Sequence, residues 1–453
     1  MSLKIELDFG KVLKLGYGKL LNIMSRFNIG HLLLISLALH LFVMSFPQDG
    51  YIFDEAHYVP AALKTLQLQP ANAEHTPLAK ILVALSIGIF GDYWFAWRIP
   101  IVITTMASLY VFYILAKRFM SRKYALFATA FLSFDIIYFV HGSIFVLDMP
   151  AILFGLIGVE RYFAKSYRWS ALAFGVSFLM KELGLFFLGT VLIYHLFTNL
   201  RVKNLKSIVN WKKFFGFFVI LLLAGGGGLW IYDAVYKPST GMTVFQNVQK
   251  NIVVDQNQTP ITTVTIITNV TVGNIITNPI EHMTFALQYF AGLAPAIVTP
   301  ESDFRPPWSW VLPIGNVFNS PKYFTVVVTS GEISHLIVNW VSQITPTVEY
   351  MLIPIVALSM FNIVKKKDKN KFGVLAISWI MVSYLPWLLL GIFVQRMTFN
   401  YYFIYTIPIL ALGIPHIWNS VPISEQYRNI GILLHLFLTI IFFVCFYPVV
   451  LMR

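Results

Sequence analysis

Residues 31–60 read "HLLLISLALHLFVMSFPQDGYIFDEAHYVP", and this stretch decides the fold class of the chain. Its first half is an unbroken apolar run of the length that crosses a bilayer as a helix. Similar runs recur throughout the 453 residues, of which 57% are hydrophobic and 12% are charged. Such a composition is too apolar for a soluble domain, so the sequence predicts an integral membrane protein built from spanning helices.

The basic residues are unevenly distributed, and they set the predicted orientation. When alternate connections between the apolar runs are assigned to the cytoplasm, most basic residues fall on that side, which is the positive-inside pattern. The formal net charge of +13 is therefore a topology signal and does not indicate a nucleic-acid partner. The cytoplasmic assignment collects 23 of the 33 Lys and Arg residues, in segments 1–30, 117–123, 161–168, 201–213 and 365–371 and at Arg428.

The apolar runs between these clusters predict an all-α polytopic membrane protein with about eleven transmembrane helices. Residues 77–91 are apolar but short, and a full span there would place the next basic cluster outside. We therefore expect an interfacial helix at 77–91, in the first outer loop. The predicted spans are 31–47, 98–117, 123–142, 146–164, 169–182, 184–200, 214–233, 346–364, 372–394, 401–418 and 429–450.

This topology divides the chain into four parts. Within the third part, the abundance of Thr, Ile, Val and Asn favours short strands or an irregular loop over helices and suggests a prokaryotic source. The parts are a cytoplasmic N-terminal segment (1–30), an N-terminal transmembrane module (31–233) with its first outer loop at 48–97, an extracytoplasmic loop region (234–340) and a C-terminal transmembrane module (341–453).

Ionisable residues gather at the outer face of the predicted topology. Charged groups at such a depth are costly and usually mark a site. Structural explanations compete with this one: the basic side chains could reach lipid headgroups, and Asp148 could pair with His141 or Lys181. The outer-face residues are Asp54, Glu55, His57, Glu74, His75, Lys80, Arg98, His141, Asp148, Lys181, Glu182 and Arg396.

Several short motifs occur around these residues in a consistent order along the chain. Together they resemble the dolichyl-phosphate-mannose protein O-mannosyltransferase family, whose members are membrane glycosyltransferases of the GT-C type. Two departures stand out: "HTPLAK" has lost one proline and the glycine of the family motif, and Tyr401 stands where the family has a histidine. The motifs are the acidic pair Asp54-Glu55, "HTPLAK" (75–80), "RIP" (98–100), "VLDMP" (146–150), "PPWSW" (306–310) and "RMTFNYYFIYTIP" (396–408).

The resemblance implies a sugar donor carried on a polyprenyl or dolichyl phosphate and a Ser or Thr hydroxyl of a protein as acceptor. It also implies a site on the extracytoplasmic face of the cytoplasmic membrane. Such a reaction inverts the anomeric carbon, and it needs cationic groups at the leaving phosphate. Lys80, Arg98 and Arg396 are the candidates for that role.

The acceptor hydroxyl is a weak nucleophile and needs a carboxylate base. Asp54 is the predicted base, and Glu55 is expected to orient the acceptor or Asp54 itself. No cofactor and no metal site are predicted, although a divalent cation on the Asp54-Glu55 pair stays an open alternative. Supporting roles are expected for His57, His75, Asp148, Lys181 and Glu182.

Two other functions remain open. The same chemistry could serve a glycolipid or cell-wall glycan acceptor, as in the related family that transfers aminoarabinose to lipid A. Less favoured is a transporter of lipid-linked sugars, which should carry internal repeats and ionisable residues near the bilayer midplane. Only Asp135 is predicted to lie at that depth.

Overall fold

The structure is a computed structural model, and it places most of the chain. Residues 1–25 lie outside the described part, so the predicted cytoplasmic segment 1–30 is described only from Arg26 onward. The described residues are 26–48, 50–71, 73–199, 211–240, 243–254, 260–270, 274–292, 306–312, 322–330, 334–366, 371–396 and 398–452.

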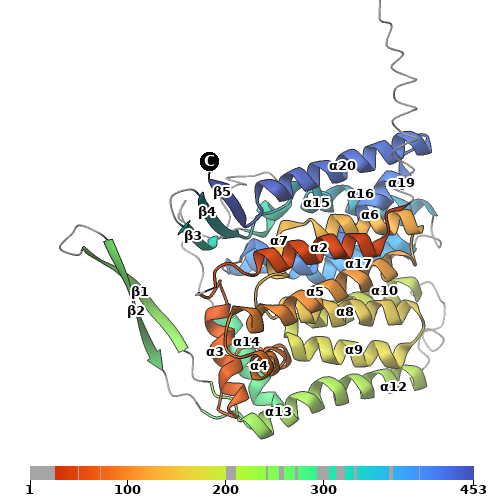
Figure 1. Ribbon diagram of the computed structural model, residues 1–453. Helices are drawn as coiled ribbons and strands as arrows, with labels where there is room; N and C mark the ends of the chain where they lie inside the picture. The colour runs from red at the N-terminus through yellow and green to blue at the C-terminus, as the bar shows by residue number, and fades with distance from the viewer. Residues whose placement is uncertain are drawn as a thin grey trace, which may run out of the picture.

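A bundle of helices running side by side makes up the body of the molecule (Figure 1). Each of the eleven predicted spans coincides with one helix or with a series of helices broken by a short turn. These are α2 (Ile29–Val43), α5 (Trp94–Ala116), α6 (Arg122–Ser133) with α7 (Ile136–His141), α8 (Asp148–Phe163), α9 (Tyr167–Met180), η1 (Glu182–Gly184) with α10 (Leu185–Asn199), α12 (Trp211–Leu221) with η2 (Leu222–Gly227) and α13 (Gly228–Tyr236), α15 (Pro346–Glu349) with α16 (Leu352–Lys366), α17 (Lys371–Ser383) with α18 (Leu385–Leu389) and η4 (Leu390–Val394), η5 (Asn400–Tyr405) with α19 (Ile407–Ser420), and α20 (Glu425–Cys445).

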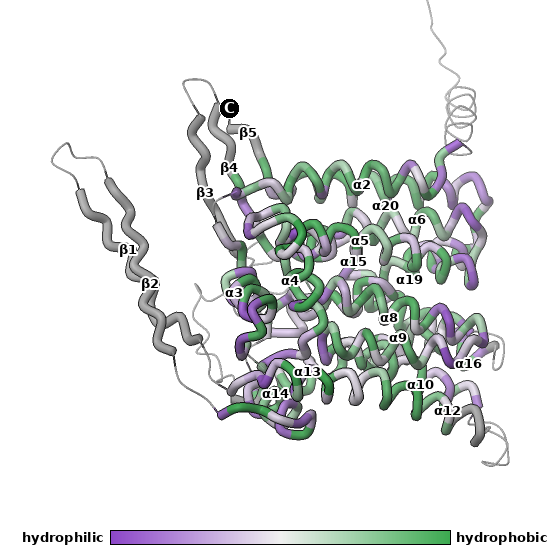
Figure 2. The backbone as a smooth tube through the Cα atoms, turned by 60° about the horizontal axis from the view of Figure 1, so that its bottom comes forward, coloured by the Kyte–Doolittle hydropathy of each residue, from purple (hydrophilic) through white to green (hydrophobic). Residues whose placement is uncertain are grey.

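The hydropathy of the bundle is that of a membrane protein. Hydrophobic residues follow the middle of the helices, and hydrophilic residues collect at their ends (Figure 2). Among the described residues, five helices are long and apolar enough to cross a bilayer, and the bent pair 371–394 makes a sixth. The remaining predicted spans coincide with shorter helices, and their full crossing stays a prediction.

Three helices that are not predicted spans lie at one end of the bundle, called here the α3 end. The helices α3 (Glu55–Leu66), α4 (Leu78–Phe90) and α14 (Pro279–Gly292) lie there. The predicted interfacial segment 77–91 is α4, which is seen almost along its axis in Figure 1 and so lies across the bundle helices. Helix α2 begins at the opposite end and runs toward α3, and the C-terminus lies at the α3 end. The chain therefore enters and leaves the bundle at opposite ends, as the predicted odd number of spans requires.

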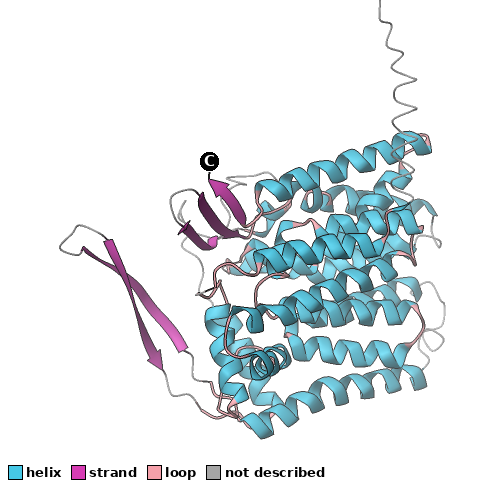
Figure 3. Ribbon diagram, viewed as in Figure 1, coloured by secondary structure: helices cyan, strands magenta, loops and turns pink. Residues whose placement is uncertain are grey.

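Strands also project from the α3 end (Figure 3). As predicted for the loop region, β1 (Thr243–Val254) and β2 (Pro260–Val270) form an antiparallel hairpin. A second antiparallel sheet has the order β3 (Lys322–Ser330), β4 (Ser334–Val341) and β5 (Val449–Met452). The predicted last span, 429–450, is therefore wrong at its end: α20 stops at Cys445, and the residues beyond Pro448 pair with β4 instead. Proline cannot continue a helical hydrogen-bond ladder, which explains the change there.

The buried Asp135 has a structural role. It precedes α7, and its Oδ1 accepts the amide of Tyr138 at 2.9 Å, so it caps that helix within the third span. The amide of Ile136 donates to Thr345 Oγ1 at 3.0 Å, which ties the same break to α15. Capping an interrupted helix supplies backbone groups with partners where no water is present. The cap gives Oδ1 of Asp135 a structural role, while its buried Oδ2 has no hydrogen-bond partner among the described residues.

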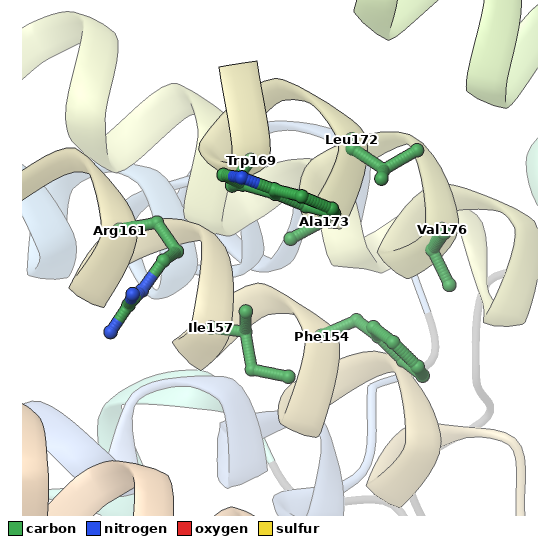
Figure 4. A pocket seen from close by; sticks show the side chains of 7 residues that line it. All are labelled: Phe154, Ile157, Arg161, Trp169, Leu172, Ala173 and Val176. Atoms are coloured by element: carbon green, nitrogen blue, oxygen red, sulfur yellow. The ribbon is translucent and has the colours of Figure 1, made fainter. Parts of the chain in front are cut away.

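An apolar hollow lies between α8 and α9 (Figure 4). Phe154, Leu172 and Val176 line it, and Trp169 and Arg161 stand toward the connection between the two helices. That connection is at the opposite end of the bundle from α3, where the predicted cytoplasmic cluster 161–168 lies. The hollow is thus distinct from the polar residues gathered by the motifs.

Candidate active site

The two adjacent carboxylates of the first outer loop have entirely different surroundings. Glu55 is fully buried, whereas Asp54 is half-buried. Asp54 stands at the N-cap of α3 yet makes no side-chain capping bond. The residue before it, Phe53, has a φ of 52°, in the left-handed region that non-glycine residues rarely adopt. This turn separates the two side chains.

Glu55 forms a buried ion pair with Arg98. The guanidinium binds both carboxylate oxygens at 2.8 Å, from Nε and from Nη2. Its remaining N–H groups donate to the carbonyls of Met44, Pro47 and Gly50, at 2.8, 2.8 and 3.1 Å. All five donors of Arg98 are thereby used, and its side chain has no exposed surface.

This pair bears on two predictions. Arg98 was expected to hold the donor phosphate, but it has no N–H group left to offer. Glu55 was expected to orient the acceptor or Asp54; its two oxygens also accept the amides of Ile52 and Phe145, each at 2.9 Å, so none is left for an acceptor, and a role in orienting the neighbouring Asp54 stays a prediction. Glu55 has no lone pair left for a cation either, so the Asp54-Glu55 pair cannot jointly hold a metal ion. Both residues instead fix the first outer loop to α5.

A second ion pair lies beside Asp54. Lys181, between α9 and η1, donates to both oxygens of Asp148 at 2.8 and 2.9 Å. Asp148 is the first residue of α8, and both side chains are buried. Of the two predicted partners of Asp148, Lys181 is therefore the one that forms the ion pair. His141 is buried next to Tyr401, with ring centroids 5.6 Å apart.

The "HTPLAK" motif forms a loop that docks on the start of η1. His75 Nδ1 lies 2.9 Å from Glu182 Oε1, and Thr76 Oγ1 donates to the carbonyl of Phe178 at 2.7 Å. Lys80, only 1% exposed, donates to the carbonyl of His75 at 3.2 Å. One N–H group of Lys80 thus binds within the loop, and the role of Lys80 at the donor phosphate stays a prediction.

Asp54 has the properties of a general base. No described residue donates a hydrogen bond to its carboxylate, so both oxygens are available to a substrate hydroxyl. Burial raises the pKa of Asp54 above its ordinary value, the positive charges of Lys181, His57 and His75 oppose that rise, and Asp148 adds to it. A carboxylate with a raised pKa is a stronger base than an exposed one. His57, a neighbour of Asp54 in the sequence, lies exposed on α3.

Arg396 is a predicted phosphate ligand with two nitrogens that lack an acceptor among the described residues. It is 7% exposed, and no described residue accepts a hydrogen bond from its Nε or Nη2. Its guanidinium carbon lies 5.7 Å from the ring centroid of Phe290 and 5.7 Å from that of Trp387. Rings stabilise a cation but cannot satisfy its N–H groups. A buried guanidinium that has no carboxylate partner among the described residues is a candidate site for an anionic ligand.

The pKa of the Tyr289 phenol, on α14, is shifted from its ordinary value. Burial, together with the charges of Glu74 and Asp54, raises the pKa of Tyr289 to about 12, and Arg396 acts in the opposite direction.

Aromatic residues connect Asp54 and Arg396. Tyr401, at the position where the family has histidine, stacks on Phe399 at 5.3 Å and meets Phe53 edge-on at 5.2 Å. Tyr402 stacks on Trp387 at 4.5 Å. The substituted position is thus packed between the turn that carries Asp54 and the segment that follows Arg396. Sequence reasoning missed Phe290, Tyr289 and Trp387, because no motif marks them.

Comparisons with known proteins give a family match for part of the chain and a shared fold. Residues 74–225 match the family model of dolichyl-phosphate-mannose-protein mannosyltransferases. No curated protein sequence matches the chain. The protein O-mannosyltransferase Pmt1-Pmt2 complex of S. cerevisiae, solved with its sugar donor, has a similar structure. The alignment of this chain with a chain of the yeast complex has a TM-score of 0.62 and 15% sequence identity, and it covers 93% of this chain and 89% of the yeast chain.

Two further solved structures are similar. ArnT from Cupriavidus metallidurans, bound to undecaprenyl phosphate, has a TM-score of 0.52 at 13% identity, over 88% of this chain and 62% of that one. The oligosaccharyltransferase of Archaeoglobus fulgidus has a TM-score of 0.54 at 9% identity, over 94% of this chain and 56% of that one. At such identities the likeness establishes the fold. Residues 74–225 thus match the family that the sequence motifs resemble, and the chain has the GT-C fold of polytopic membrane glycosyltransferases.

Proposed function

We propose that this protein is an inverting glycosyltransferase that moves a sugar from a polyprenyl-phosphate carrier to a hydroxyl group. The observation that carries the proposal is that the α3 end holds two groups without hydrogen-bond partners among the described residues: the half-buried carboxylate of Asp54, and Nε and Nη2 of the buried Arg396 guanidinium. One group suits the acceptor and the other suits the leaving phosphate. The sugar donor bound to the yeast mannosyltransferase complex and the undecaprenyl phosphate bound to ArnT support a lipid-linked donor.

The reaction follows from these two groups. The acceptor oxygen attacks the anomeric carbon, and Asp54 takes its proton. The bond between that carbon and the phosphate oxygen breaks, and the carrier phosphate leaves with the bonding electrons. Because phosphate is a stable anion, no general acid is needed, but the charge that develops on it must be stabilised. Arg396 supplies the positive charge that stabilises the leaving phosphate, and its planar guanidinium has a fork of N–H donors that fits phosphate oxygens.

The finer assignment is mannose as the sugar and Ser or Thr hydroxyls of proteins as acceptors, at the extracytoplasmic face of the cytoplasmic membrane. The motifs and the family match over 74–225 support it. The test is incubation of purified protein with labelled polyprenyl-phosphate-mannose and a Ser/Thr-rich peptide. Parallel reactions offer a glycolipid acceptor. Label in the peptide supports the assignment, label in the glycolipid alone gives the other acceptor class, and label in neither rejects the mannosyl donor.

Replacing Arg396 by alanine is expected to weaken binding of the carrier phosphate. Hydrogen bonds to charged groups contribute roughly 1.5–3 kcal/mol, so affinity should fall about 10- to 150-fold. Arg396→Lys should recover part of the loss, since it keeps the charge but not the fork. Binding would be measured with polyprenyl phosphate in lipid nanodiscs. The exposed Lys64, also at the α3 end, gives the matched control Lys64→Ala, which should bind normally. Normal binding by Arg396→Ala would remove it from the phosphate site.

The rate of transfer should depend on pH through Asp54. Only the ionised carboxylate accepts a proton, and burial raises the pKa of Asp54. The rate is therefore expected to fall as the pH is lowered, beginning at a higher pH than for an exposed aspartate. The measurement is the rate of single-turnover transfer at saturating donor over a range of pH. The residual activity of Asp54→Asn should not fall in this way at low pH. If the fall persists in this variant, it is caused by the protonation of another group.

A further inference from the structure

Helix α14 comes from the long outer loop, yet it completes the site around Arg396. Its residue Phe290 lies over the Arg396 guanidinium, and the Phe290 ring centroid is 5.4 Å from that of His75. Phe290 therefore bridges the phosphate candidate and the "HTPLAK" loop. The position of α14 thus determines whether the Arg396 side chain is enclosed.

The start of α14 is fixed by its own sequence. Asn278 precedes the helix, and its Oδ1 accepts the amide of Glu281 at 3.0 Å. Pro279 occupies the first helical position, where no amide hydrogen is needed. These residues define where the helix begins, but they do not fix its rotation against the bundle.

A buried pair fixes that rotation. His282 Nδ1 lies 2.6 Å from Asp233 Oδ1, and the two side chains are 1% and 0% exposed. Asp233 belongs to α13, the outer end of a spanning helix series and the principal element against which α14 packs. A buried, hydrogen-bonded pair of this kind is strongly directional, because a carboxylate left alone in an apolar interior is costly.

His282 and Phe290 share one face of α14. Positions i, i+4 and i+8 of a helix lie one above another, and the residue between them, Ala286, is 2% exposed. On the other side, Ile280 is 79% and Leu287 is 65% exposed. Eight residues span roughly 12 Å of helix, so the pair with Asp233 sets the register that brings Phe290 to Arg396.

We propose that the His282–Asp233 pair is an anchor that positions Phe290 over Arg396, so that Phe290 is a further residue of the carrier-phosphate site. His282 and Asp233 are positioning residues, and Phe290 makes the contact. The ring faces the guanidinium, holds its plane and excludes water from it, which strengthens its bond to a phosphate. This inference rests on the proposed function, since it takes Arg396 as the ligand of the carrier.

The test measures binding of polyprenyl phosphate to the full-length protein in nanodiscs. Phe290→Ala is expected to lower affinity about 3- to 30-fold, the range of a desolvated cation–π contact. Phe290→Tyr should retain affinity and Phe290→Leu should lose it, because only an aromatic face attracts the guanidinium. Leu287→Ala, on the exposed face of the same helix, is the matched control and should bind as the unmodified protein does.

A double-variant cycle separates positioning from general loosening of the fold. His282→Ala should lose about as much affinity as Phe290→Ala, and the combined variant should lose no more than either. Additive losses, or normal affinity in both single variants while the unmodified protein binds the carrier, would overturn the inference alone. If the unmodified protein binds no polyprenyl phosphate, the proposed function fails and the inference falls with it.

Discussion

Replacing Asp54 by asparagine is expected to slow sugar transfer by about 10²–10⁴-fold, the usual contribution of general-base catalysis. Asparagine keeps the shape of the side chain and still accepts a hydrogen bond from the acceptor hydroxyl, but it cannot take the proton. Because no described residue donates a hydrogen bond to Asp54, the fold should be unaffected. The measurement is single-turnover transfer at saturating donor.

Carrier binding by Asp54→Asn serves as the control for this prediction. It should be unchanged or slightly tighter, because a carboxylate near a phosphate repels it. If Asp54→Asn retains more than about a tenth of the transfer activity, its loss is much smaller than the expected loss for removal of a general base. The base would then be another group. Glu55 is not the natural second choice, since Arg98 and two backbone amides occupy its oxygens.

Replacing Arg98 by alanine is expected to destabilise the protein by about 3–5 kcal/mol, the cost of removing one partner from a buried ion pair. The change leaves Glu55 charged and buried without a counter-ion. It also strands the carbonyls of Met44, Pro47 and Gly50 in the connection between α2 and α3. We expect a large drop in the yield of monodisperse protein and in the apparent Tm of what remains.

Arg396→Ala provides the contrast, since it removes a buried arginine that has no carboxylate partner among the described residues. That variant should keep its Tm and lose carrier affinity, whereas Arg98→Ala should lose Tm. Combining Arg98→Met with Glu55→Gln should cost less than the sum of the single changes, because no unpaired charge is left buried. An Arg98→Ala protein with an unchanged Tm and weak carrier binding would restore Arg98 to the phosphate site.

The two arginines show why the motifs were informative without being sufficient. Both "RIP" and "RMTFNYYFIYTIP" place an arginine at the same face of the membrane, and the sequence treats them alike. In the structure all five donors of the Arg98 guanidinium are satisfied by protein atoms, whereas two nitrogens of Arg396 have no acceptor among the described residues. Of the two, Arg396 is therefore the one that we propose as a phosphate ligand.

The sequence by itself determined the fold class, because the bilayer acts as a solvent that demands long apolar helices with their backbone groups paired internally. It predicted the positions of the spanning helices and of the interfacial helix α4, and it placed Asp54, Lys181 and Arg396 at one face of the membrane. The tertiary structure alone decided which charges are satisfied. Glu55 and Arg98 are 43 residues apart, and whether they meet depends on how each helix is rotated about its axis. That rotation is set by packing, which hydropathy does not encode. The same reason explains α14: its residues carry no motif, and only the contact between His282 and Asp233 brings Phe290 to Arg396.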